Sequence, residues 1–293
     1  MPAFNRSDGR DVHVYDAKDP DTVIGGLVLT SGITNANLYS MVEIICFIDG
    51  IFFLRDEYDT TIQRDDSSLH PGKYYILTAG TVTPSDEPWL VRTISAGTGT
   101  RVAAFRDAVR DRDGRCIITG EVALSGHRGL WAGFEAAHIF PLAYEQHWTN
   151  YDYSRWITVP ATSGGSINSV QNGVLLRDDI HTLFDSYLIS INPDDGYKVV
   201  CFQPDGKNIA GKHLDQQFLE DPRRPVDQLL RWHFRQAVLA NMKGAGEPVF
   251  ECDFPPGSDM VGEILSGPRA GEVMEFELFS RLAVGDKPKA TGY

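Results

Sequence analysis

The sequence predicts an α+β protein in which a β-rich N-terminal domain precedes a larger mixed domain. Three observations predict this organisation. Short apolar runs separated by Gly, Pro and Asp clusters fill the first hundred residues, as expected for strands. Two later stretches, 100–113 and 225–242, carry apolar residues at helical spacing. Between them, two apolar runs on either side of residues 192–196 predict a β-hairpin.

The N-terminal domain is expected to span residues 1–99, with a role that the sequence does not indicate. One helix is predicted over residues 37–48, where apolar residues recur on one side. Strands are predicted over residues 12–15, 23–29, 51–54, 74–77 and 90–94. The domain boundary is placed at Gly99, because Thr100 is a suitable N-cap for the next helix.

The second domain is expected to span residues 100–212. Its first helix is predicted to end at Asp113-Gly114, and a short strand and turn to follow over 116–120. A C-terminal helical extension, residues 213–293, is predicted to pack on this domain through the amphipathic helix 225–242. A last helix is expected near residues 270–282.

Composition describes an ordinary globular protein of 293 residues, 42% hydrophobic and 23% charged. No stretch approaches the roughly 18 apolar residues of a membrane helix, and the polar start carries no signal for secretion. An intracellular protein, cytoplasmic or nuclear, is therefore expected. The four cysteines form no Cys-x-x-Cys pair, so neither structural zinc nor a disulfide framework is expected. The oligomeric state stays open.

Charge alone does not favour a nucleic-acid-binding protein. The formal net charge is −13, whereas affinity for phosphates comes largely from Lys and Arg. Residues 101–128 are an exception, with six arginines against four acidic residues. This basic strip could face a phosphate backbone. A solvated helix face with ion pairs explains the same pattern, and charge alone favours that interpretation.

The polar landmarks of the second domain are a histidine, an asparagine and a second histidine, each beside an apolar run. They lie in the segments EAAHIFP (135–141), QNGVLL (171–176) and DIHTLFD (179–185). This ordered set resembles the HNH endonuclease family, whose ββα-metal unit cuts phosphodiester bonds with one divalent ion. The resemblance implies such a unit embedded in the second domain, with a strand ending at His138, a strand over 170–176 and a helix over 177–186.

The resemblance also implies a role for each landmark. His138 matches the general base that activates water, and His181 matches the metal ligand on the helix. Asn172 matches the loop asparagine that braces the strand pair or orients the base. Asp185 lies one helical turn after His181 and is expected to accept its second ring N–H.

The metal ligands are where the sequence departs from the family pattern. Many members carry Asp directly before the base histidine, but this position is Ala137 here. Glu135 is expected to compensate as a ligand. Strand alternation places Glu135 and His138 on opposite faces, so Glu135 is expected to reach the metal only through a bulge or twist. The implied cofactor is one divalent ion, Mg²⁺ or Mn²⁺, and no structural zinc.

Five further residues are candidates for contacts with phosphate or substrate: His127, Arg128, Arg177, Trp148 and Trp156. The two tryptophans lie in a long aromatic loop between the landmark segments. Their rings could stack on unpaired bases or line a pocket for a small molecule. Packing of the loop onto the domain is the interpretation that the sequence favours.

Three functions follow in order of preference. The first is a metal-dependent endonuclease acting on DNA. The second is an enzyme that keeps the HNH fold but acts on a small metabolite, with His138 as acid or base, which the acidic chain and the aromatic loop would suit. The third is a noncatalytic binding module. Segments 10–27 and 230–234 are also similar to those of fungal proteins that carry an HNH unit, but they identify no substrate.

Overall fold

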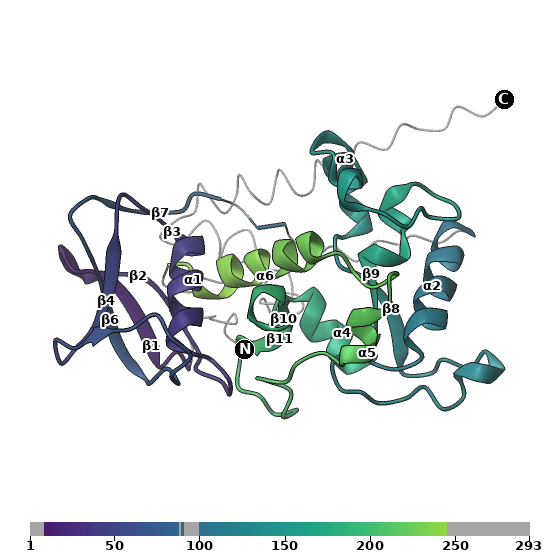
Figure 1. Cartoon of the computed structure of the whole chain (residues 1–293), viewed down its shortest axis with the longest axis horizontal. Coiled ribbons are helices and arrows are strands. Elements are labelled where there is room, and N and C mark those ends of the chain that lie inside the picture. The colour runs from purple at the N-terminus through teal and green to yellow at the C-terminus, as the bar shows by residue number, and fades with distance from the viewer. Residues whose placement is uncertain (1–8, 88, 91–99, 245–293) are drawn as a thin grey trace, which may run out of the picture.

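The computed structural model describes residues 9–87, 89–90 and 100–244. Within them, the strands form one five-stranded sheet and three two-stranded sheets. Figure 1 shows the five-stranded sheet at one end of the molecule and helix α2 (Thr100–Asp113) at the other, with helix α6 (Asp227–Met242) between them. The predicted α+β class with a β-rich N-terminal part is confirmed.

The five-stranded sheet has the order β2-β1-β6-β4-β5, and every neighbouring pair is antiparallel except β1 with β6. Helix α1 (Asn35–Ile45) packs on this sheet, because its apolar stripe is buried in one core with the strands. The strands are β1 (Val12–Asp16), β2 (Asp19–Leu27), β4 (Phe52–Asp56), β5 (Thr61–Ile62) and β6 (Gly72–Thr78).

The helix expected over 37–48 ends earlier in the sequence than predicted. It begins after Thr34, whose Oγ1 accepts a hydrogen bond from the Asn37 backbone N–H at 3.2 Å, and it stops at Ile45. Strand β3 (Cys46–Ile48) follows at once and pairs with β7 (Val82–Pro84), because Phe47 and Ile48 favour extended backbone. Most of the strand expected over 90–94 lies outside the described residues.

The centre of the second part is an antiparallel hairpin of β8 (Phe134–His138) and β9 (Gly173–Arg177). Helix α4 (Asp178–Asp185) follows β9 directly, and the predicted second hairpin follows α4. That hairpin consists of β10 (Ile189–Asn192) and β11 (Lys198–Cys201). The loop between β8 and β9 contains the short helix α3 (Glu145–Asn150), and α5 (Gln216–Glu220) precedes α6.

Two short segments near the hairpin differ from the prediction. Residues 116–120 form a turn closed by a 2.8 Å bond from the Gly120 N–H to the Cys116 carbonyl, not a strand. Residues Val170–Asn172, expected to open the second strand, form a 3₁₀ helix. There Ser169 caps the Gln171 N–H, and side-chain bonds of this kind compete with strand pairing.

Helix α6 contributes to two hydrophobic cores. Leu229 and Leu230, in its first turn, are buried in the core around β8, β9 and α4. Phe234, the residues from Ala237 to Ala240, and Met242 are buried in the core of α1 and the five-stranded sheet. The helix expected near 270–282 lies outside the described residues. Across the described ranges, none of the helices has the length and apolar character needed to cross a membrane.

Candidate functional site

The β8–β9 hairpin lies between helices α2 and α4 (Figure 1). Its register is regular from Phe134–Arg177 to His138–Gly173. On one face, the His138 ring stacks on Phe105 of α2, with ring centroids 3.7 Å apart and planes 10° apart. On the other face, the Glu135 side chain reaches His181 of α4. The two landmark histidines are therefore supported by different helices, one on each side of the hairpin.

The His138 side chain has two partners that sequence reasoning missed. Phe105 supports one face of the ring, and Asn168 Oδ1 lies 3.2 Å from Nε2. Asn168 is itself buried and donates from Nδ2 to the Gly164 carbonyl at 2.6 Å. Neither partner stands out in the sequence, because Phe105 lies on the helix before β8 and Asn168 lies far along the loop after it.

Asn172 is fully buried and joins the two ends of the β8–β9 loop. Its Oδ1 accepts from the Phe140 N–H at 2.8 Å, and its Nδ2 donates to the carbonyls of Phe140 and Ile167 at 3.1 and 2.9 Å. Its backbone carbonyl also accepts from the Ile139 N–H at 2.9 Å. These bonds correspond to bracing the strand pair, the first of the two roles that the family resemblance offers.

His181 lies between two carboxylates. Glu135 Oε2 is 2.6 Å from Nδ1, and Asp185 Oδ2 is 3.1 Å from Nε2. Glu135 reaches His181 without a bulge, since the β8–β9 ladder is regular, and its expected role as a metal ligand stays a prediction. The contact forms because α4 packs on the face of the hairpin that carries Glu135 and Ala137, the face opposite His138.

The residues around His181 offer two ligands to a divalent ion. Carboxylate oxygen and imidazole nitrogen suit Mn²⁺, and the carboxylate suits Mg²⁺, which usually keeps several waters. Glu135 and His181 would hold such an ion, with Asp185 orienting the imidazole through Nε2. Among residues 9–87, 89–90 and 100–244, no group of three or more His, Cys, Asp or Glu side chains is arranged to hold a metal. The remaining positions would therefore belong to water and substrate.

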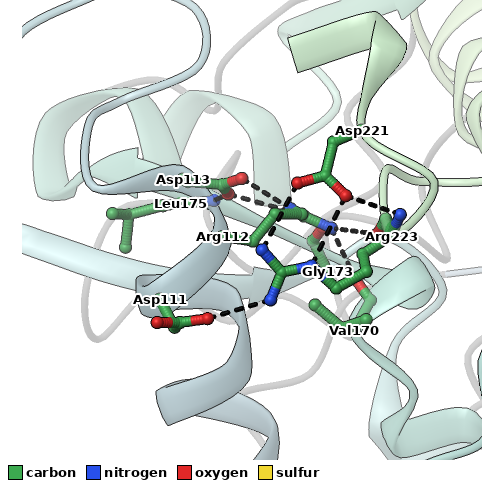
Figure 2. Close-up of polar contacts among 8 residues, drawn as sticks. All are labelled: Asp111, Arg112, Asp113, Val170, Gly173, Leu175, Asp221 and Arg223. Atoms are coloured by element: carbon green, nitrogen blue, oxygen red, sulfur yellow. Dashed lines mark hydrogen bonds and ion pairs between the residues drawn. The ribbon is translucent and has the colours of Figure 1, made fainter.

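A buried polar node fastens α2 to the start of β9 (Figure 2). Arg112 Nε and Nη2 bind the Asp113 carboxylate at 2.6 and 2.8 Å. The same guanidinium donates to the carbonyls of Val170 and Gly173 at 2.8 and 2.7 Å, while Asp113 accepts from the Leu175 N–H at 2.8 Å. Arg112, part of the predicted basic strip, is thus committed to holding the loop end that carries Asn172.

The positive charge of Arg177 is engaged in ion pairs with two carboxylates. It binds Glu121 and Asp179, and these bonds, that from Glu121 first, raise the pKa of its guanidinium. Asp179 also binds Lys207, and the bonds from Lys207 and Arg177 lower its pKa. In contrast, His127 and Arg128 are both exposed on the 3₁₀ helix Gly126–Arg128. All three side chains reach solvent, but the Arg177 guanidinium is engaged by two carboxylates.

The aromatic loop packs on itself. Trp148 is buried, its Nε1 donates to Ser166 Oγ at 3.0 Å, and its ring lies edge-on to Phe140. Trp156 is half-buried and stacks on Tyr153 with centroids 4.9 Å apart. Burial in this loop also lowers the pKa of His147. Packing is the role that the sequence favoured for both tryptophans, and the buried position of Trp148 does not suit the alternative of substrate contact.

Comparison with known families gives a match over this part of the chain. Residues 116–192 match the HNH endonuclease family model. The matched segment contains β8, β9, α4 and β10, so it coincides with the ββα arrangement described above. The chemistry of the HNH family is phosphodiester hydrolysis with a divalent metal. The HNH resemblance is therefore confirmed for this domain.

The segment before the HNH domain matches a second family model. Residues 9–83 match a domain of unknown function (DUF8573), and they contain the whole five-stranded sheet and α1. No curated protein and no solved structure gave a significant match to the chain. The similarities found thus concern the two parts separately and assign a chemistry to the HNH domain alone.

Proposed function

We propose that the HNH domain is a metal-dependent endonuclease that hydrolyses phosphodiester bonds in DNA. The observation that carries the proposal is the fixed position of His181 on α4 between Glu135 and Asp185, behind a strand that ends in His138. A strand pair and a following helix thus present one histidine suited to proton transfer and one suited to metal binding, in the order that the family resemblance implies.

Each residue of the site has a separate role in the proposed hydrolysis. His138, when neutral, accepts a proton from the attacking water near pH 7. Glu135 and His181 would hold the ion, Asp185 would orient His181, and Asn172 keeps the ends of the loop together. The bound ion supplies neutralisation of charge on the phosphate and on the leaving oxygen. His127 and Arg128 are exposed on the same domain and would contact phosphate oxygens.

The test is nicking of supercoiled plasmid DNA with Mg²⁺ or Mn²⁺, and with EDTA as a control. We expect His138→Ala and His181→Ala to abolish nicking, while the same change at the exposed His70 of the N-terminal sheet region leaves it intact. Absence of cleavage by the unmodified protein with either metal and any DNA form, or equal cleavage by His138→Ala, would refute the endonuclease proposal.

The alternative of metabolite chemistry rests on the acidic chain and the aromatic loop, and the packing of the loop gives it little support. Phe140 contacts Trp148, Tyr153 and Trp232, so these rings fill space between elements. The third possibility, a noncatalytic module, differs from the endonuclease in that it would bind no metal at Glu135 and His181.

A further inference from the structure

We propose that Asn168, and not Asn172, is the residue that holds the base His138 in one tautomer and one orientation. The proposal rests on the endonuclease function above and names a positioning residue for its base. The family pattern points to Asn172, since that asparagine occupies the expected place in the motif. The hydrogen bonds of Asn168 and Asn172 indicate instead that Asn168 contacts the base and that Asn172 binds the backbone of the loop.

The amide of Asn172 is committed to the backbone. Its Nδ2 donates both hydrogens, one to the Phe140 carbonyl and one to the Ile167 carbonyl, and its Oδ1 accepts from the Phe140 N–H. All three of these side-chain bonds go to the backbone of Phe140 and Ile167, and none goes to the His138 ring. Asn172 therefore secures the loop on which the site is built.

The amide of Asn168 has a determined orientation. Its Nδ2 lies 2.6 Å from the Gly164 carbonyl, which can only accept a hydrogen bond, so Oδ1 is the atom that faces His138 Nε2 at 3.2 Å. Since Oδ1 can also only accept, the hydrogen of this bond belongs to Nε2. The neutral His138 ring consequently carries its lone pair on Nδ1, which is the atom that would take the proton from water.

Packing restricts the ring to this arrangement. Phe105 is nearly fully buried and stacks almost parallel to the His138 ring at 3.7 Å. Gly173 lies opposite His138 in the ladder and leaves the space that the Phe105 ring occupies. A ring rotation would have to break both the Asn168 bond and the stack on Phe105.

Two substitutions of Asn168 separate contact with the base from anchoring of the loop. Asn168→Ala removes both the acceptor for His138 and the donor to Gly164. Asn168→Asp removes the donor but keeps an acceptor oxygen for Nε2. Asn150→Ala, at an exposed helix position in the same loop, is the matched control. If Asn168 only anchored the loop, Ala and Asp would have equal effects on His138.

The first readout needs no activity. In ¹⁵N spectra of the histidine ring nitrogens, we expect neutral His138 to carry its proton on Nε2 in the unmodified protein and in Asn168→Asp, and both tautomers to appear in Asn168→Ala. A single unchanged Nε2–H tautomer in a folded Asn168→Ala protein would overturn the proposal. Since this spectrum is independent of DNA cleavage, it decides the matter even if the endonuclease proposal fails.

The second readout is plasmid nicking as a function of pH. We expect Asn168→Ala to lower kcat about tenfold at unchanged KM, the effect of one lost hydrogen bond. In Asn168→Asp, the adjacent carboxylate favours the imidazolium, so the acid limb of the rate profile should move to higher pH. Equal kcat losses in both variants, with no movement of the acid limb, would show that Asn168 anchors the loop only.

Discussion

Arg112 and Asp113 are neighbours in sequence and bind each other through side chains that are both fully buried. Such a pair is costly to place in a protein interior, and its cost is offset here by further hydrogen bonds to the backbone of residues 170–175. Six residues earlier in α2, Arg106 and Asp107 form a pair of the same composition that is exposed to solvent. Because the two pairs consist of the same residue types, a comparison of them shows the effect of burial on the stability that an Arg–Asp pair contributes.

We therefore expect Asp113→Asn to lower the free energy of unfolding by about 3–5 kcal/mol, because it leaves the Arg112 charge buried without its partner. Asp107→Asn should change it by less than about 1 kcal/mol. Urea unfolding followed by circular dichroism measures both. Similar small effects of the two substitutions would show that the buried pair does not hold α2 to β9.

Gly173 is needed for steric reasons and not for its backbone freedom. Its φ of −139° suits any residue, but a Cβ would come within 2.5 Å of the Phe105 ring. We expect Gly173→Ala to destabilise the protein by about 1–3 kcal/mol and to disturb the Phe105–His138 stack. Gly206→Ala, where a Cβ would meet no atom within 4 Å, is the control. Thermal unfolding compares them, and equal stability of the two variants would contradict this explanation.

His147 should contribute to the pH dependence of stability. Burial lowers its pKa below the value of 6.5 expected for an unfolded chain. The folded protein therefore binds fewer protons at this residue, so its contribution is complete above pH 6.5 and is lost as the pH falls through the lower folded value. His147→Phe should flatten the decline in unfolding free energy below pH 6.5, and His70→Phe, at an exposed site, should not. An unchanged slope in His147→Phe would exclude this contribution.

Metal binding at the carboxylate–histidine cluster can be measured without a substrate. Mn²⁺ at a hundredfold excess over its Kd should stabilise the protein by about 2.7 kcal/mol, seen as a higher Tm. Glu135→Gln and His181→Ala should each remove most of this increase, whereas Glu145→Gln, at an exposed carboxylate of α3, should retain it. A Tm increase that survives both changes would place the ion elsewhere, and no increase in any protein would favour a noncatalytic module.

The sequence was informative where a pattern is local. Periodic apolar residues predicted α1 and α6, and the order of His138, Asn172 and His181 predicted the hairpin and α4. Two errors in the predicted secondary structure arose where strand propensity competed with local helical hydrogen bonding. Residues 46–48 pair with β7 instead of continuing a helix, and Ser169 caps a 3₁₀ turn where a strand was expected.

The supporting residues of the site could not be predicted in the same way. Phe105, Arg112 and Asn168 reach the hairpin only through tertiary packing, over separations of about 30 to 60 residues. Their residue types are common in helices and loops, so no periodicity marks them. Glu135 shows the reverse case: strand alternation gave its face correctly, but the position of α4, on which its contact with His181 depends, is a property of the fold.

The position of α2 also bears on what part of this protein can be produced alone. The family match begins at residue 116 and ends at residue 192, so it omits α2, β11 and α6. A fragment cut at these borders would expose Gly173 where Phe105 normally covers it, and it would leave the carbonyls of Val170 and Gly173 without Arg112. The smallest fragment of the chain that folds alone is therefore larger than the segment that matches the HNH endonuclease family model.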